Sequence, residues 1–394
     1  MTRAIAIVSP RRAFAAFGAV LLLGAVFAVG VVRAEDAPAP YVPPATGPVE
    51  ADGYYEVIEA VAPGVWAIRQ AKSFHLQPIG NVTVIEQSDG LVLVDGGGSP
   101  GSARRIAALI RTVSSKPVKA LILTHWHGDH SLGFGTLQAM WPNMQVIATE
   151  QTKARLVTSM DFYAQGAPDA DHTAAFMERV SGMDQFLRGA AAATTIDDAG
   201  RAGYAQAARE FVRYRADADG LFIGRVTRTF TDTVTLADAK RPVQLIHPGR
   251  GNTDGDAAVW LPRQKILASG DLVIAPVPFG FNAYPAAWEA ALRRLAALHP
   301  KAIIPGHGAV ERDTAYLTRL TALIHATRER TKAAADRGLS LDETKAAVDL
   351  SDLAPDFTGQ DSWLKKWFAR YWTDPFVEAC WKEAKGEPIE QGHG

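Results

Sequence analysis

Short apolar runs alternate with amphipathic stretches through most of the chain, and this pattern predicts a sheet-rich α/β fold. Between residues 54 and 95 the runs are rich in Val, Ile and Tyr and are broken by turn residues, as in paired strands. Ile106, Leu109, Ile110 and Val113 have the spacing of a helix that lies on a sheet. Further strands are predicted at 118–123, 146–148, 225–230, 233–236, 243–246, 257–261, 265–268 and 302–304.

The strand signals are interrupted once and end well before the C-terminus. Residues 150–221 are rich in Ala, Arg and Asp and carry helical stripes, which predicts a helical insertion of about seventy residues, far longer than an ordinary connection. From residue 313 to 394 the pattern is helical throughout. The order of elements over residues 53–312 fits an αββα sandwich, in which two sheets lie face to face with helices outside.

The first 34 residues form a separate segment. Three arginines precede the apolar stretch 13–32, and a small-x-small sequence follows it, which is typical of a secretory signal cleaved after Ala34. The stretch is also long enough to serve as an uncleaved membrane anchor. Residues 35–52 contain five prolines and predict an extended linker. We therefore expect a periplasmic or secreted protein that does not contact the membrane once the signal is removed.

Composition excludes some classes of function. The chain has 394 residues, is 47% hydrophobic and has a formal net charge of −1, so it can bury a large core but offers no basic surface for nucleic acid. The only cysteine is Cys380, so no intramolecular disulfide can form. It lies far from the other candidate residues, and we interpret it as a packing residue.

One segment carries most of the candidate chemistry. Thr124–His130 reads Thr-His-Trp-His-Gly-Asp-His and directly follows the predicted strand 118–123. Three of the ten histidines in the chain fall here within six positions, beside an aspartate. Imidazole nitrogens and a carboxylate oxygen suit Zn²⁺ or Fe²⁺. The segment therefore predicts a metal site at the end of a buried strand.

This segment resembles the HxHxDH signature of the metallo-β-lactamase-fold hydrolases. Four other regions resemble that family in the same order along the chain: the paired strands, a glycine-rich turn, an aspartate turn and a last histidine. They lie at 80–97, 249–256, 268–271 and 304–308. The resemblance covers about residues 64–308 and implies the αββα fold and metal-dependent hydrolysis.

The resemblance implies two neighbouring metal positions. The first position would use His125, His127 and the residue before Thr253. The second position would use the side chains Asp129, His130, His307 and the bridging Asp271. It also implies zinc, one or two ions per chain, with iron or manganese as alternatives. Asp95 would hold the backbone or a ligand imidazole in place, although a helix-capping carboxylate is an alternative role.

The sequence departs from the family at Asn252, where a histidine is usual. An amide oxygen is a poorer zinc ligand than imidazole. The enzyme would then work with one metal in the second position, or the first position would fill weakly. His247, five residues earlier, is a less favoured substitute, and a catalytically inactive relative is the sceptical alternative. We expect Asp129 to ligate or act as general base, and Asn252 to donate a hydrogen bond to a developing oxyanion.

Several residues outside the metal set are candidates for substrate contact. A loop before the second predicted strand pair carries Phe74 and His75, and an apolar segment after the aspartate turn carries Phe279, Phe281 and Asn282. For His75 alone, a solvent-facing loop position is the favoured interpretation, and substrate contact is the alternative.

We predict a hydrolase that uses a zinc-bound hydroxide on a small molecule with a cyclic or activated carbonyl, such as a β-lactam, lactone, ester or thioester. A phosphodiesterase of the same fold and a non-catalytic metal-retaining binding module are the alternatives. The tryptophans in the C-terminal extension predict packing against the core or against a second copy of the chain in a homo-oligomer.

Overall fold

Two β-sheets form the centre of the protein in its computed structural model, which describes residues 55–70 and 79–392. The seven-stranded sheet has the order β1-β2-β3-β4-β5-β6-β7. Its strands are β1 (Glu56–Ala62), β2 (Val65–Gln70), β3 (Val82–Glu86), β4 (Leu91–Val94), β5 (Val118–Ile122), β6 (Gln145–Thr149) and β7 (Arg228–Phe230). The five-stranded sheet has the order β12-β11-β10-β9-β8. Its strands are β8 (Thr233–Leu236), β9 (Val243–Ile246), β10 (Ala258–Leu261), β11 (Ile266–Ile274) and β12 (Ala302–His307).

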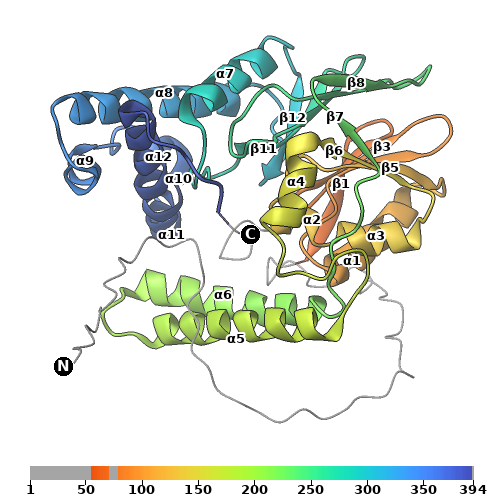
Figure 1. The fold of residues 1–394 in the computed structure, drawn as a ribbon, viewed down its shortest axis with the longest axis horizontal. Helices are drawn as coiled ribbons and strands as arrows, with labels where there is room; N and C mark the ends of the chain where they lie inside the picture. The colour runs from red at the N-terminus through yellow and green to blue at the C-terminus, as the bar shows by residue number, and fades with distance from the viewer. Residues whose placement is uncertain (1–54, 71–78, 393–394) are drawn as a thin grey trace, which may run out of the picture.

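Helices cover the outer faces of both sheets (Figure 1). The first group is α1 (Pro100–Val113), α2 (Gly128–Ser131), α3 (Phe134–Met140), α4 (Glu150–Thr158), α5 (Ala170–Ala192) and α6 (Asp198–Asp217). The second group is α7 (Pro285–Ala296), α8 (Ala315–Asp336), α9 (Leu341–Ala347), α10 (Pro355–Thr358), α11 (Ser362–Trp367), the π-helix η2 (Phe368–Thr373) and α12 (Asp374–Lys385). The predicted αββα class with its helical insertion and helical C-terminal extension is confirmed.

The side chains of single strands divide between two cores, which is why the strands are apolar without interruption. In β4, Leu91 and Leu93 pack on the side of α1, whereas Val92 and Val94 pack between the two sheets. Successive side chains of a strand point to opposite faces, so a strand buried on both faces has no polar positions. A third cluster lies between the second sheet and the helices α7, α8, α11 and α12.

The parallel part of the first sheet places the histidine segment. β4 pairs with β5 in parallel, and α1 connects them as the crossover helix. The side chain of Ser99 caps α1 by accepting from the amide of Ser102, and Pro100 occupies the first helical position. Both strands therefore end at the same edge of the sheet, with Asp95 after one and Thr124 close after the other.

The parallel strands β11 and β12 show that one predicted turn is wrong. Residues 268–271 were predicted to form a turn, but they lie within strand β11, which continues to Ile274. Gly270 has φ +52°, and the pairing with β12 shifts register on either side of it. An added Cβ at Gly270 would lie 2.5 Å from the Cβ of Thr124. The irregular strand therefore brings Asp271 directly against the histidine segment.

The insertion and the C-terminal extension contact each other. Figure 1 shows α5 and α6 as a pair running side by side below the sheets, with α11 next to them. The rings of Tyr204 in α6 and Trp363 in α11 are 5.1 Å apart, and Lys366 pairs with Asp197 at 2.6 Å. Arg105 of α1 anchors α6 through Asp217.

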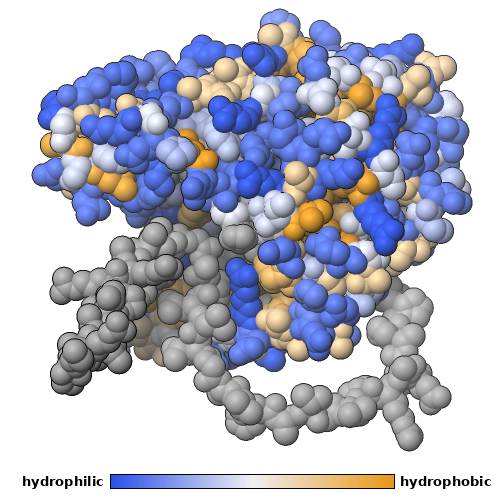
Figure 2. Space-filling model, viewed as in Figure 1, coloured by the Kyte–Doolittle hydropathy of each residue, from blue (hydrophilic) through white to orange (hydrophobic). Residues whose placement is uncertain are grey.

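The aromatic residues of the extension face this chain's own core. Trp363, Trp367 and Trp372 are buried in the third cluster, together with Cys380. These indoles therefore pack within the chain itself. The homo-oligomer stays a prediction. Polar residues cover most of the face shown in Figure 2, and apolar ones form small separate patches.

The described residues contain no helix long and apolar enough to cross a membrane. The predicted signal 1–34 and linker 35–52 lie outside the described residues, as do Phe74 and His75.

Candidate metal centre

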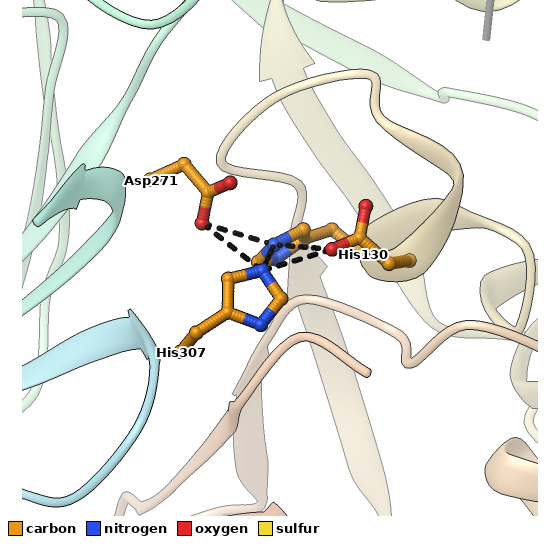
Figure 3. Close-up of side chains that lie close together, drawn as sticks. His130, Asp271 and His307 are labelled. Carbon is orange, nitrogen blue, oxygen red and sulfur yellow. Dashed lines mark hydrogen bonds and ion pairs between the residues drawn. The ribbon is translucent and has the colours of Figure 1, made fainter. Parts of the chain in front are cut away.

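Four side chains from three separate parts of the chain converge where the two sheets meet. Asp129 and His130 come from α2, Asp271 from β11 and His307 from the end of β12. One ligand atom of each lies within 4.8 Å of the others. His130 Nε2 is 3.1 Å from Asp271 Oδ1 and 3.2 Å from His307 Nε2 (Figure 3). Asp129 Oδ2 is 2.9 Å from His307 Nε2. These are the residues predicted for the second position.

A second group shares one member with the first. His125, His127 and Asp271 also offer ligand atoms within 4.8 Å of one another. Asp271 Oδ2 is 3.6 Å from His125 Nε2, while its Oδ1 faces His130. Asp271 thus lies between the two groups, in the place that the predicted bridging role requires. Every predicted metal ligand belongs to one of these groups.

Asp95 holds the histidine segment in place. Its carboxylate accepts from the amide of Thr124 at 2.8 Å, from the Thr124 hydroxyl at 2.8 Å and from His130 Nδ1 at 2.9 Å. A carboxylate can only accept, so His130 carries its proton on Nδ1 and its Nε2 offers a lone pair to the centre. The capping alternative fails because Ser99 caps α1.

The donor set fits a metal ion. His125 Nε2 and Asp271 Oδ1 are buried and have no hydrogen-bond partner among the described residues. Asp271 Oδ1 lies 3.1 Å from His130 Nε2, and these two atoms come together either around a second proton on His130 or around a metal ion. A divalent cation in the place of that proton would satisfy two imidazole nitrogens and two carboxylates together.

The electrostatics of the centre also favour a cation. Burial alone would lower the pKa of His130, but the carboxylates of Asp271, Asp129 and Asp95 raise it well above the usual value. Burial raises the pKa of Asp129, yet His130 and His307 outweigh it and hold the pKa below the usual range. Burial lowers the pKa of His125 well below its usual value, with His130 and His127 adding to the effect, which keeps His125 in the neutral form that binds metal.

Asn252 is buried, and its amide has a fixed orientation. Nδ2 donates to the carbonyl of Phe279 at 2.8 Å, whereas Oδ1 is buried and has no partner among the described residues. The predicted oxyanion contact is not tested and stays a prediction, but one amide hydrogen is already engaged. His247 belongs to neither metal group within the described residues, and its Nδ1 bonds to the carbonyl of Asp256 at 2.6 Å.

The predicted substrate residues differ in their distance from the centre. The ring of Phe279 is 5.4 Å from that of His307 and is 9% exposed. Phe281 is 37% exposed, and its nearest described ring is that of Tyr371 at 5.1 Å. Asn282 is exposed, with φ +50°, and its carbonyl accepts from Gln391. Of the three, Phe279 is the one beside the centre.

Two tyrosines near the centre were missed from the sequence. Tyr371, in the π-helix, has its ring 5.1 Å from Phe279, and its carbonyl accepts from Gly280 at 2.7 Å. Burial raises the pKa of Tyr371 and of Tyr163 above the usual phenol value, and the charge of Asp129 contributes to both. Both hydroxyls are therefore neutral and within electrostatic reach of Asp129. The density of aromatic residues in the extension was visible, but nothing in the sequence indicated that a π-helix turns one of them towards the centre.

Comparison with known proteins decides the family. The sequence model of the metallo-beta-lactamase superfamily matches residues 77–307, more than half of the chain, and spans every metal-group residue. The chain belongs to the metallo-beta-lactamase superfamily. The two groups of residues that could hold a metal ion both lie within the matched region.

Individual members of the superfamily show similarity over different lengths. A linear primary-alkylsulfatase from Pseudomonas sp. (strain ATCC 19151) is 25% identical over 303 residues, which is 72% of this chain and 52% of the relative. This chain thus spans about half the length of that curated relative. The structure of the stereoselective inverting sec-alkylsulfatase Pisa1 from Pseudomonas sp. is 15% identical with a TM-score of 0.57, over 83% of this chain and 50% of that chain. A metallo-beta-lactamase from Pontibacter korlensis is 20% identical with a TM-score of 0.48, over 68% of this chain and 99% of that chain.

Proposed function

We propose that this protein is an exported zinc-dependent hydrolase of small molecules with an activated carbonyl, namely an ester, thioester, lactone or β-lactam. The observation that carries the proposal is the convergence of Asp129, His130, Asp271 and His307 around one point. Iron and manganese also accept imidazole and carboxylate ligands and are the alternatives to zinc.

The residues of the second position would hold the ion. When bound, the ion supplies a Lewis acid that polarises the substrate and makes a water molecule acidic near neutral pH. Asp95 keeps the Nε2 lone pair of His130 directed at the centre. Asp129 is the most exposed side chain of the four, at 18%, and its low pKa keeps it ionised. As an ionised carboxylate it would either ligate the ion or, when turned away from it, accept a proton from the attacking water.

The aromatic residues beside the centre would hold the apolar part of the substrate. Phe279 lies against His307 on one side and Tyr371 on the other. Phe281, which is partly exposed next to Tyr371, would extend this surface outward. A substrate with an apolar group beside its scissile bond would fit this surface better than a fully polar one.

A second candidate is the hydrolysis of alkyl sulfate esters. The relative from Pseudomonas sp. (strain ATCC 19151) is an alkylsulfatase and matches 72% of this chain. An alkyl sulfate also combines an apolar chain with an anionic group that a bound cation attracts. A phosphodiesterase is less favoured, because the net charge of −1 provides little attraction for polyanionic substrates.

The test is a substrate panel assayed with the purified zinc-loaded protein. An aryl ester, a thioester, a lactone, a chromogenic β-lactam, an alkyl sulfate and a phosphodiester are each incubated with wild type, with chelated protein and with Asp271→Asn. Carbonyl substrates are expected to be cleaved by the loaded wild type alone. Cleavage of the alkyl sulfate alone would replace the first candidate with the second. Activity that is equal in all three samples would refute a metal-dependent hydrolase.

A further inference from the structure

The orientation of Asn252 gives the first metal position a property of its own. We propose that Asn252 Oδ1 completes this position, together with His125, His127 and Asp271, and that the amide oxygen lowers its preference for Zn²⁺ over oxygen-preferring cations such as Mn²⁺, compared with an imidazole at the same place. The inference rests on the metal centre of the proposed function and adds a fourth ligand and a cation preference to it.

The backbone places Asn252 beside the two groups that it would join. On one side of its turn, the amide of Ala257 donates to the carbonyl of Thr124 at 2.8 Å, next to His125. On the other side, a Cβ added at Gly251 would lie 2.5 Å from the side chain of Leu272, next to Asp271. The turn that carries Asn252 is therefore in contact with the segments that carry His125 and Asp271.

The amide cannot reverse its orientation without a loss. Phe279 offers a carbonyl oxygen, which needs a donor, and Nδ2 is the only donor in the Asn252 side chain. The hydrogen bond therefore directs Oδ1, at the other end of the amide group, away from the Phe279 carbonyl. There Oδ1 is buried, and Asn252 as a whole is 1% exposed. An acceptor buried without a partner is unfavourable, and a cation supplies the missing partner.

The Nε2 atom of His125 is a second buried acceptor that lacks a partner in the described part of the chain, and it also favours a cation at this position. His125 Nε2 is buried and has no partner among the described residues, while its Nδ1 contacts the Thr124 hydroxyl at 3.0 Å. Two buried acceptors, one nitrogen and one oxygen, are thus left without a hydrogen-bond partner among the described residues, in the loops after β5 and β9. A water molecule could satisfy them only by donating to both. A cation satisfies both and also neutralises the charge of Asp271.

The mixed ligand set narrows the difference in affinity between zinc and manganese. Two imidazoles, one carboxylate and one amide oxygen provide equal numbers of nitrogen and oxygen atoms. Amide and carboxylate oxygens suit Mn²⁺, whereas zinc gains most from imidazole and thiolate. We therefore expect the second position, with its charged carboxylates and two imidazoles, to bind zinc tightly, and the first position to bind zinc weakly.

The experiment measures cation affinity at the two positions of the full-length protein. Wild type, Asn252→His and Asn252→Leu are dialysed against metal-free buffer, counted by elemental analysis and titrated calorimetrically with ZnCl₂ or MnCl₂. Asn143→His serves as a matched control, because it adds an imidazole on an exposed turn away from the centre. Asn252→His should bind zinc at the first position on the order of 100-fold more tightly than wild type. The control should match wild type.

The leucine variant decides whether Oδ1 is a ligand. Asn252→Leu keeps the size of the side chain but has no oxygen, so Mn²⁺ affinity at the first position should fall at least tenfold, with the second position unchanged. Retention of the wild-type Mn²⁺ affinity would overturn the proposal, and so would two zinc ions retained by dialysed wild type. If Asn252→Leu does not fold, Asn252→Asp replaces it. Mn²⁺ affinity equal to or above that of wild type is expected there, and a loss would overturn the proposal.

The experiment can refute the role of Asn252 without refuting the proposed function. If wild type holds one tight zinc and hydrolyses substrate while Asn252→Leu binds Mn²⁺ as wild type does, only the role of Asn252 is refuted. If wild type binds neither cation at either position, the proposed function itself is refuted.

Discussion

Replacing Asp95 with asparagine should weaken metal binding, although Asp95 is not one of the predicted metal ligands. Asp95 is 1% exposed and belongs to neither metal group of the described residues, and its carboxylate accepts three hydrogen bonds, two from Thr124 and one from His130. Asparagine keeps the size of the side chain and tolerates the left-handed backbone at this position, where φ is +66°. The substitution therefore changes the hydrogen bonding with little effect on the fold.

Either orientation of the new amide is unfavourable. If its NH₂ faces the Thr124 amide, two donors meet and one buried hydrogen bond is lost. If it faces His130, Nδ1 must become the acceptor, and the imidazole proton moves to Nε2, where it points at the centre. Loss of one charge-assisted hydrogen bond should cost about 1.5–3 kcal/mol of stability. Loss of a buried group that orients a ligand should weaken metal binding roughly 10–100-fold.

The assay combines urea unfolding with a zinc titration, and Asp256→Asn is the control. Asp256 accepts from the amide of Thr253 at 2.9 Å and from its hydroxyl at 2.7 Å, as Asp95 does with Thr124, but no imidazole of the described residues contacts its carboxylate. We expect both variants to lose stability and only Asp95→Asn to lose affinity at the second position. Zinc affinity equal to wild type in Asp95→Asn would refute the argument that this carboxylate sets the His130 tautomer.

Three further predictions concern the substrate surface, the C-terminal extension and the N-terminus. Tyr371→Ala should raise KM several-fold for substrates with an apolar group, because Phe279 loses its ring partner, and should leave metal content unchanged; unchanged KM across a chain-length series would contradict this. Burial raises the pKa of Glu289, but hydrogen bonds from Arg293 and Arg328 outweigh it and hold the pKa below its usual value. The ionised Glu289 therefore stabilises the folded protein above the usual carboxyl pKa, and this contribution disappears as the pH falls through the pKa in the folded state. Glu289→Gln should thus lower the free energy of unfolding, measured with urea, by about 1–3 kcal/mol at pH 7 and by progressively less below about pH 4.5. A difference between variant and wild type that does not change with pH would refute this reasoning. Protein from the native host should begin at Glu35 by N-terminal sequencing, whereas an intact Met1 on membrane-bound protein would favour an anchor.

The αββα class and the histidine segment were predictable because both depend on local sequence. Strands buried on both faces leave uninterrupted apolar runs, as in β4, and the histidine segment is contiguous. Asp271 and His307 are far apart in the sequence, so their place in the site came from resemblance to the family. The structure then brought them within 4.8 Å of Asp129 and His130.

Features that depend on long-range contacts were not predictable. The continuation of β11 through Asp271 depends on its pairing with β12 and on the positive φ of Gly270, which no local pattern specifies. Tyr371 lies beside Phe279 because the π-helix packs against the segment after β11. The orientation of Asn252 depends on the Phe279 carbonyl, 27 residues away in the sequence.

The central claim is that the second position holds the metal needed for hydrolysis, and the metal content of His307→Ala tests it most directly. The variant and wild type are dialysed identically, checked for equal secondary structure by circular dichroism and analysed for zinc, iron and manganese. Turnover of the best substrate from the panel is measured on the same samples. The account predicts that the variant loses the tightly bound ion together with turnover. Full metal content and full turnover in His307→Ala would contradict it.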